Sequence, residues 1–341
     1  MSKYSQASQG DIELEKALNG LSQMGNGVPA TTGNVYFVIP ASDSNYVEFY
    51  DKYQTTYKDG TQAVHNTIAS AYADVTSNRH DIIMLSANSA HAQTSMLSIA
   101  KNRVHFVGMS LRGGGFGIGA RTRVTMGVTS AATDLGVMQN TGTGNTFRGI
   151  KFDSGNTKDE SLYAVVEAGE YSIYENCEFY KSSDLDVTGA AELVQNGDSA
   201  QFIRCSFGSA VNVLSGAVIR PNVLITQGIV TSKNCTDSVF EECIFLKKAG
   251  NVANRFVYGA NATDVKRMLW FKGCLFFNNP EGAATPALAV DMAAAQTMGA
   301  IVVDQNCLAV DVTLLATTGE GTYVLAPTAS AYATRGLATN A

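Results

Sequence analysis

Acidic side chains are the residues of this sequence most suited to chemistry, because glycosidic bond hydrolysis uses two carboxyl groups that flank the bond. The candidates are Asp184, Asp186, Glu192, Asp198, Glu241 and Glu242. Asp184 and Asp186 would share a face of an extended segment, but their surroundings, Ser-Ser-Asp-Leu-Asp, are typical of a loop. Glu241 and Glu242 are adjacent and would point to opposite faces of a strand. We therefore expect these carboxylates to be solvated surface groups, and no catalytic residue is assigned.

Two other patterns in the sequence are candidates for a cofactor site or for nucleophilic catalysis. The glycine-rich stretch 112–121 contains a variant dinucleotide fingerprint, but a strand-like Arg-Val-Thr-Met follows it where the fingerprint requires a helix. We interpret the stretch as a turn with positive backbone φ. The four histidines, at 65, 80, 91 and 105, show no triad partner or His-x-x-x-His spacing. No cofactor and no metal is predicted.

A six-residue pattern recurs through the chain and organises everything around it. It reads aromatic-x-x-[Ile/Cys]-x-Phe, with its fourth position at Ile150, Cys177, Cys205, Cys243 and Cys274, and a degraded copy at Cys307. The spacing of 27 to 38 residues indicates a structural repeat. The last three positions alternate apolar and polar residues, which predicts a strand with Cys and Phe facing inward.

One short strand cannot bury its apolar side alone, so we expect the repeats to stack about 4.8 Å apart and to form inward ladders of Cys and Phe. The five repeat cysteines should be reduced core residues. Metal ligation is not expected, because no Cys-x-x-Cys occurs and cysteines in single file do not make a tetrahedral site.

The repeat resembles the right-handed parallel β-helix of the pectate-lyase-like superfamily over roughly residues 80 to 310. In many phage and pectate-lyase-like β-helices an amphipathic helix leads into Asp-x-Ile-x-Leu, as Asp81-Ile-Ile-Met-Leu85 does here. The family's usual Gly-x-Tyr after that strand is replaced by Ser-Ala-Asn-Ser-Ala. The resemblance implies an all-β solenoid. Where such proteins are enzymes, it also implies a site of carboxylates, Lys, Arg or His on the outer strand face.

The predicted layout has four parts. Residues 1–34 form an N-terminal arm with a short helix over 11–21, and residues 35–80 form a capping region with a strand at 35–39 and an amphipathic helix over 61–76. Residues 81–310 form the β-helix, with early turns of about 20 to 25 residues and a hairpin-like insert over 208–238. Residues 311–341 lose the repeat register and end in a docking tail over 326–341. A tyrosine-rich segment at 46–57 is read as a packing surface in preference to a carbohydrate platform.

Composition limits the range of partners. With a net charge of -6, the sequence lacks the excess of basic residues that is typical of nucleic-acid-binding proteins. No apolar run is long enough to span a membrane. No secretory signal is recognised, which argues against a disulfide framework.

These features favour a non-enzymatic virion structural protein of a tailed phage, either capsid decoration or a head or tail fibre component. Its expected partners are capsid or other virion proteins, bound through its termini, and further copies of itself, most simply as a trimer. The main alternative is a tailspike-type protein that binds or depolymerises host surface glycan. A third option, a bacterial polysaccharide lyase, is disfavoured because no export signal is recognised.

Overall fold

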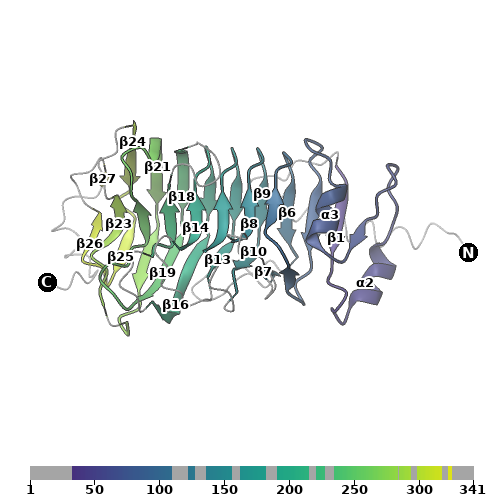
Figure 1. Cartoon of the computed structure of the whole chain (residues 1–341), viewed down its shortest axis with the longest axis horizontal. Helices are drawn as coiled ribbons and strands as arrows, with labels where there is room; N and C mark the ends of the chain where they lie inside the picture. Colours follow the sequence, from purple (N-terminus) through teal and green to yellow (C-terminus); the bar gives the residue numbers. More distant parts are fainter. Residues whose placement is uncertain are drawn as a thin grey trace, which may run out of the picture.

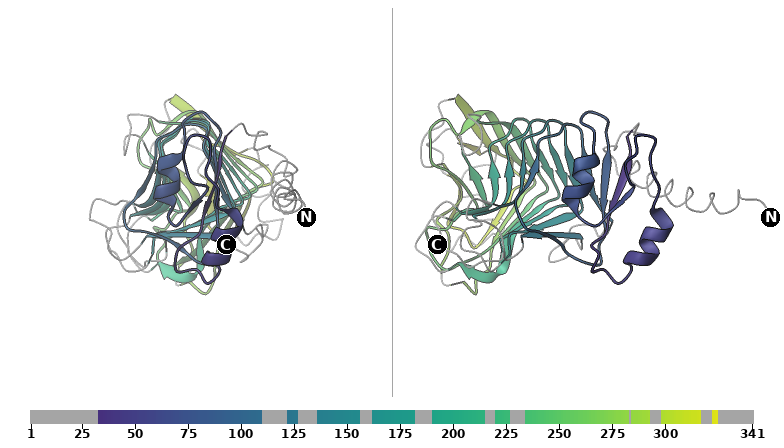
Figure 2. Two further views of the ribbon diagram at one scale, coloured as in Figure 1. Left: turned by 90° about the vertical axis from the view of Figure 1, so that its right-hand side faces the viewer. Right: turned by 45° about the vertical axis from the view of Figure 1, so that its right-hand side comes forward.

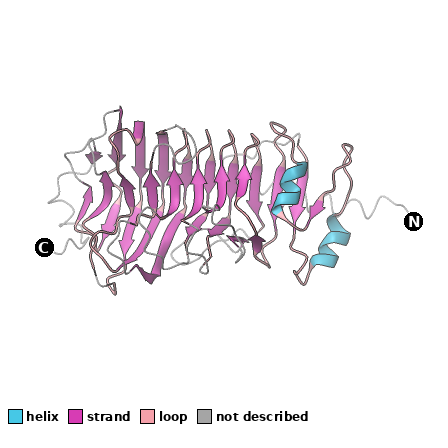
Figure 3. Cartoon of the chain, in the orientation of Figure 1, coloured by secondary structure: helices cyan, strands magenta, loops and turns pink. Residues whose placement is uncertain are grey.

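The chain forms a stack of short strands along one axis, with the N-terminal elements at one end and the last strands at the other (Figure 1). The computed structural model describes residues 33–109, 122–126, 136–155, 162–181, 190–214, 220–226, 234–282, 284–292, 298–316 and 322–324. The predicted helix over 11–21, the glycine-rich stretch and the tail over 326–341 lie outside these residues. In the described part the regular structure is nearly all strand, joined by turns and loops, with two short helices near the N-terminal end (Figure 3).

Three sheets make up the solenoid. Sheet 1 contains β2 (Val64–His65), β1 (Val35–Val38), β3 (Ile82–Leu85), β6 (His105–Gly108), β9 (Thr146–Arg148), β12 (Ile173–Glu175), β15 (Gln201–Ile203), β18 (Cys235–Glu241), β21 (Val265–Lys272), β24 (Met298–Val303) and β27 (Thr322–Val324). Sheet 2 contains β4 (His91–Gln93), β7 (Thr122–Met126), β10 (Ile150–Asp153), β13 (Glu178–Tyr180), β16 (Ser206–Leu214), β19 (Ile244–Ala249), β22 (Leu275–Asn278) and β25 (Leu308–Val310). Sheet 3 contains β5 (Leu97–Ile99), β8 (Gly136–Asn140), β11 (Tyr163–Glu167), β14 (Ala191–Gln195), β17 (Val223–Ile225), β20 (Val257–Gly259), β23 (Leu288–Met292) and β26 (Leu314–Ala316).

From β3 onward each turn visits sheet 1, sheet 2 and sheet 3 in that order, and each strand pairs in parallel with its equivalents in neighbouring turns. The predicted parallel β-helix is therefore confirmed, and the view along the axis shows the strands enclosing a common interior (Figure 2). The expectation of one strand per repeat is wrong. The six-residue pattern crosses a corner, because Phe147 lies in β9 of sheet 1 whereas Ile150 and Phe152 lie in β10 of sheet 2.

The corner inside the pattern uses a left-handed residue immediately before the Ile or Cys. Those residues, with positive φ throughout, are Gly149, Asn176, Arg204, Glu242 and Gly273. A left-handed conformation lets the chain turn sharply from sheet 1 into sheet 2, and it is unstrained only for glycine. Arg204 and Glu242 therefore hold a costly conformation that the stacked turns on both sides impose.

Two aromatic columns fill the core. In sheet 1, Phe106, Phe147, Tyr174, Phe202, Phe240 and Phe271 stack with successive ring centroids 4.6 to 5.1 Å apart. In sheet 2, Phe152, Phe179, Phe207, Phe245 and Phe276 stack in the same way, and the two columns meet edge to face. Every ring in both columns is at most 2% exposed.

The predicted cysteine ladder lies at the same corner. Each thiol donates to the carbonyl of the core aromatic in the preceding turn, as in Cys177 to Phe147 at 3.3 Å and Cys243 to Phe202 at 3.2 Å. All six cysteines are buried and free in the structure, including Cys235, which lies outside the ladder.

The early turns are assigned differently from the sequence prediction. Early turns of 20 to 25 residues would place the strand-like segments at 104–109 and 123–126 in successive turns, but β6 belongs to sheet 1 and β7 to sheet 2 of the same turn. The step from His105 to its partner Thr146 is 41 residues, so the expected compact turns of 20 to 25 residues are wrong at this point. The 123–126 strand resembles a core repeat because inward Val124 pairs with Phe152.

The N-terminal cap is present but shorter than predicted. Helix α3 spans Ile68–Asp74, and Thr67 caps its start by accepting from Ser70 N at 3.1 Å. The residues before it cannot be helical because β2 pairs with β1. Buried Ile68, Ala71 and Val75 join the core, so the helix covers the interior of the first turns. Lys101 holds its other end by donating to three carbonyls, those of Tyr72, Ala73 and Val75, at 2.6 to 2.9 Å.

The tyrosine-rich segment forms helix α2 (Tyr46–Tyr53) on the outer side of β1. Phe49 and Tyr53 contact the ring of Phe37 with centroids 5.8 and 4.9 Å apart. This supports the packing interpretation of the segment.

Two expectations for the later part of the chain are wrong. Residues 208–214 do not begin a projecting hairpin, because β16 runs on after a bulge and pairs with the extension of β19. The register also continues past residue 310, since β26 pairs with β23 and β27 pairs with β24.

Candidate functional site

The outer face of sheet 2 divides into a polar half and an apolar half. Residues that alternate with the inward phenylalanines point outward. In the first turns the outward rows are Arg123, Lys151, Glu178 and Ser206 in one line and Thr125, Asp153 and Tyr180 in the next. In the last turns the same rows are Ile244, Leu275 and Leu308, and Leu246, Phe277 and Val310.

The polar half brings two carboxylates together with a lysine and a tyrosine. Lys151 Nζ lies 2.7 Å from Glu178 Oε1 and 4.4 Å from the ring centre of Tyr180. Asp153 pairs in register with Tyr180. Burial, followed by the negative charge of Asp153, raises the pKa of the Tyr180 hydroxyl. These side chains could carry out acid–base catalysis on a bound sugar. However, the Glu178 carboxylate is held in an ion pair with Lys151.

Sheet 1 carries charged residues on the side opposite its aromatic column, and the first pair, Arg148 with Glu175, is buried. Arg148 Nε lies 3.1 Å from Glu175 Oε2, and Glu175 also pairs with Arg204. Further along, Lys272 Nζ lies 2.5 Å from Glu241 Oε1. Arg148 with Glu175, and Glu241 with Lys272, are register partners on adjacent strands, so each pair joins consecutive turns.

The four acidic candidates that the structure describes do not form one site. Asp184 and Asp186 lie outside the described residues. Asp198 is at the corner before sheet 1, where Ser199 donates to it at 2.8 Å, and Glu241 is paired with Lys272. Exposed Glu242 follows at the corner residue.

Glu192 is the candidate for which the surface prediction is wrong. It is 4% exposed and lies where sheet 2 turns into sheet 3, among three basic side chains: Lys181, Arg220 and Lys247. Each of these cations is at most 3% exposed. Arg220 Nη2 lies 3.7 Å from Glu192 Oε1, and Lys247 Nζ donates to Arg220 O at 2.7 Å. We call Glu192, Arg220, Asn222 and Lys247 the corner cluster.

Burial sets the electrostatics of the corner cluster. It raises the pKa of Glu192 against the opposing effects of Arg220 and Lys247. It lowers the pKa of Lys247 to about 7, since the nearby Glu192 only partly offsets the loss of water. Lys247 is therefore a buried amine that is substantially uncharged near neutral pH.

Sequence reasoning missed the corner cluster because its members are far apart in the chain. Lys247 has a usable signal, since Phe245 points inward and a residue two positions along a strand points the same way. A lysine at such a position is either paired or functional.

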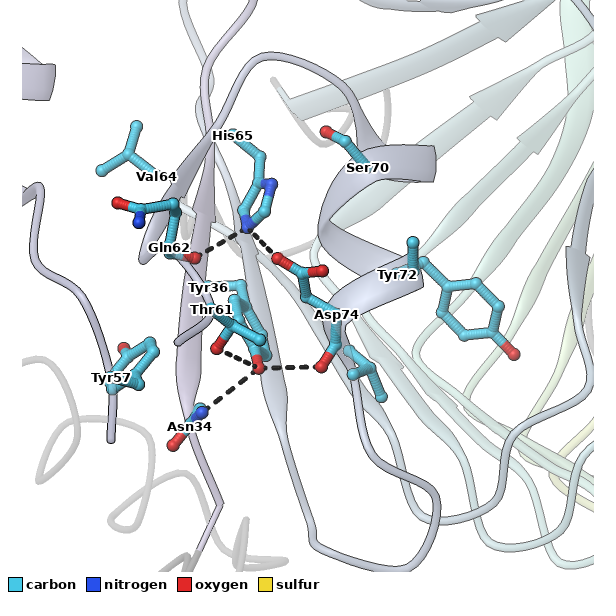
Figure 4. A network of polar contacts seen from close by, with 12 residues as sticks. Asn34, Tyr36, Tyr57, Thr61, Gln62, Val64, His65, Ser70, Tyr72 and Asp74 are labelled. Atoms are coloured by element: carbon cyan, nitrogen blue, oxygen red, sulfur yellow. Dashed lines mark hydrogen bonds and ion pairs between the residues drawn. The ribbon is translucent and has the colours of Figure 1, made fainter. Parts of the chain in front are cut away.

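A second polar network joins the N-terminal strands to the cap (Figure 4). The Tyr36 hydroxyl donates to Asp74 O at 2.9 Å and accepts from Arg79 at 2.9 Å, while His65 contacts Gln62 O at 2.8 Å. Arg79 also makes two bonds to fully buried Asp81, at 2.7 and 2.9 Å. These contacts satisfy the buried Tyr36 and Asp81, so the network fixes the cap to the first strands.

The described residues hold no group of three His, Cys, Asp or Glu side chains suited to a metal ion. Neither described helix is long and apolar enough to cross a membrane.

The strand order, the parallel register and the inward ladders decide the fold. It is a parallel β-helix. Solved structures that this β-helix resembles include a pectin methylesterase from Aspergillus niger, at 14% identity and TM-score 0.49, covering 88% of this chain and 83% of that one. Pectate lyase Pel9A is similar at 12% identity and TM-score 0.49, covering 87% and 76%. ORF18 of Geobacillus virus E2 is similar at 10% identity and TM-score 0.42, covering 76% and 56%. These likenesses concern the fold alone. No family model and no curated protein matches the sequence.

Proposed function

We propose that this β-helix is a non-enzymatic structural protein of a tailed-phage virion, serving as capsid decoration or as part of a head or tail fibre. The observation that carries the proposal is the pairing of outward charges between turns. Lys151 with Glu178, Arg148 with Glu175, and Glu241 with Lys272 are each register partners in ion-pair contact. These carboxylates join one turn to the next, which is a structural use of groups that an enzyme would present to substrate.

The core supports the same role. Continuous aromatic columns give each turn a large apolar contact with both neighbours, and stability that accumulates turn by turn suits a rigid rod-like component. Attachment is then assigned to the termini: residues 1–34, which are polar and rich in glycine, and residues 326–341, which are almost uncharged and have little apolar bulk. Self-association, with a trimer as the simplest form, belongs to the same proposal.

The test is binding to virions by truncated and substituted proteins. Full-length protein is mixed with capsids or tails and imaged for binding and copy number. Deleting 1–34 or 326–341 should abolish incorporation and leave the circular dichroism of the solenoid unchanged. Glu178→Ala and Glu241→Ala should incorporate normally. Normal incorporation of both truncated proteins would contradict the proposal.

A second candidate, host-glycan binding or depolymerisation, is favoured by the polar half of sheet 2. Asp153, Glu178 and Tyr180 lie on one outer face with Lys151 between them. Release of reducing sugar from host capsule or O-antigen by the isolated protein, lost in Glu178→Gln and kept in Glu241→Gln, would establish this activity and overturn the structural proposal.

A further inference from the structure

The outer face of sheet 2 changes character along the solenoid, and its last turns keep apolar side chains exposed. Where the first turns place Arg123, Lys151 and Glu178 outward, β19, β22 and β25 place apolar residues outward in the same rows. Leu308 is 38% exposed, and the others are half-buried. We call this surface the apolar face and define it by Ile244, Leu246, Leu275, Leu308 and Val310.

Sheet 1 shows how this chain covers an apolar outer surface elsewhere. The outward residues at its N-terminal end pack against helix α2 through Phe49 and Tyr53. Each of these outward residues is at most 8% exposed: Val35, Phe37, Ile82, Met84 and Val107. Both helices in the described part of the chain, α2 and α3, lie at the end of the stack opposite to β22 and β25 (Figure 1). Neither helix therefore covers the apolar face.

The size of the apolar face fits one short helix. Strands lie about 4.8 Å apart and residues two positions apart on a strand lie about 7 Å apart, so three strands with two outward residues each measure roughly 10 by 7 Å. The same face of a second copy would bury far less than the area of about 800 Å² per partner that a stable dimer needs. Two to three turns of an α-helix, which is about 10 Å wide and rises 5.4 Å per turn, match this surface.

The sequence predicts one more amphipathic helix, over residues 11–21 of the N-terminal arm, which lie outside the described residues. Its apolar residues follow helical spacing on one face: Leu14, Ala17, Leu18 and Leu21. A helix of this length is about 16 Å long, enough to cross β19, β22 and β25. The chain itself thus supplies a segment of the required size and polarity.

Chain length favours the arm of a second copy over the arm of the same copy. The arm joins the stack at Asn34, whose backbone N donates to Asp81 Oδ1 at 2.7 Å beside β1 and β3. Strand β21, in the same turn as β22, lies seven places after β1 in sheet 1, which is about 34 Å along the axis. The segment 22–33 that would bridge this distance has an average end-to-end span of about 20 Å as an unstructured chain. Reaching its own apolar face would hold the segment almost straight, at a large cost in conformational entropy.

We propose that the N-terminal arm of one copy docks on the apolar face of another, with the apolar stripe of residues 11–21 against β19, β22 and β25. The inference rests on the self-association included in the proposed function and identifies the two surfaces that make it. Because the arm and the face are different surfaces, the contact is heterologous, and it closes when the copies exchange arms around a ring.

The mass of the full-length protein in solution, without virions, tests the proposal by light scattering. The wild type should have a multiple of the single-chain mass, and Leu18→Asp in the arm or Leu275→Asp in the face should reduce it to the single-chain mass. Asn19→Asp, on the other side of the predicted helix, and Arg123→Asp, in the same row of sheet 2 as Leu275, are the matched controls and should keep the wild-type mass. Circular dichroism checks that each variant is folded, and Leu308→Asp replaces Leu275→Asp if that variant is not.

Disulfide trapping identifies the two surfaces and shows whether they belong to different copies. Leu18→Cys and Leu308→Cys chains are mixed and oxidised, and peptide mapping should find a link between residues 18 and 308. The native cysteines are buried, so the wild type should give no link. With both substitutions in one chain, a link found only within single chains would overturn the proposal, as would an unchanged mass in both face variants. A wild type of single-chain mass that still binds virions would overturn this inference and leave the proposed function standing.

Discussion

Truncation of one core ring, Phe240→Ala, tests the stacking that holds the solenoid together. Phe240 is fully buried, and its ring centroid lies 4.6 Å from Phe202 and 5.0 Å from Phe271. It meets Phe207 edge to face at 5.7 Å and Phe245 at a tilt at 5.9 Å. Removing a buried phenylalanine side chain costs about 3–5 kcal/mol. Each lost aromatic pair adds about 0.5–1.5 kcal/mol to what burial alone would give, so we expect the upper end of that range.

Urea unfolding measures this loss of unfolding free energy, and the single tryptophan reports on unfolding at one known place in the stack. Trp270, the single tryptophan, lies beside Phe271 on the next turn, so its fluorescence reports on the turns next to the truncation. Circular dichroism reports on the whole stack. Because turns contact only their neighbours, we expect the two transitions to separate in Phe240→Ala and to coincide in the wild type. Tyr171→Ala, at a ring that is 61% exposed, is the control and should change little. A loss below about 1 kcal/mol for Phe240→Ala would refute the stacking argument.

Three further predictions concern the corners, the acid response and the thiols. Glu242→Gly should raise the free energy of unfolding by about 1 kcal/mol by relieving a left-handed residue, whereas Gly273→Ala at the equivalent corner should lower it by a similar amount, and urea midpoints that move the other way would contradict this. Burial, then the positive charges of His80 and Arg148, lower the pKa of His105 to about 4. Protonation therefore opposes folding: stability is complete above the ordinary pKa of 6.5 and falls by on the order of 3 kcal/mol as pH drops toward 4. His105→Asn should flatten this part of the profile in pH-dependent unfolding, and an unchanged slope would show that other groups cause it. All six cysteines should react with a thiol reagent in denaturant and almost none in the native state, and two or more disulfides in a peptide map would contradict the ladder.

The sequence predicted the part of the fold in which side-chain type and inward direction coincide. Cys177, Phe179 and their equivalents follow strict alternation, so their register could be read directly. Sheet 3 was not recognised as a third strand of every turn, because β14 places polar Glu192 and Gln195 inside and outward Val194 is buried as well. Such a strand lacks the alternation of apolar and polar residues by which a strand is recognised in a sequence. The corners were missed for a related reason, since Arg204 and Glu242 occupy positions where glycine would have been the signal.

The corner cluster shows what a single sequence cannot supply. The residues around Glu192 in the sequence do not distinguish it from a surface acid. Its burial depends on the lengths of the connecting segments that bring Arg220 and Lys247 to the same corner. The paired charges of Lys151 and Glu178 were equally hidden, because the pairing follows from register between turns. Alternation predicts which way a side chain points. It does not predict which residue of another turn it meets.

The hydrogen bonds between parallel strands run along the solenoid axis, and this gives the rod a directional mechanical response. A pull along the axis loads the contacts between successive turns in series, so the strength of the rod equals that of its weakest interface and does not grow with length. Bending loads the same contacts on the convex side of the rod, so its weakest interface also limits how far it can bend. Lengthening such a component by further turns therefore adds reach without adding tensile strength.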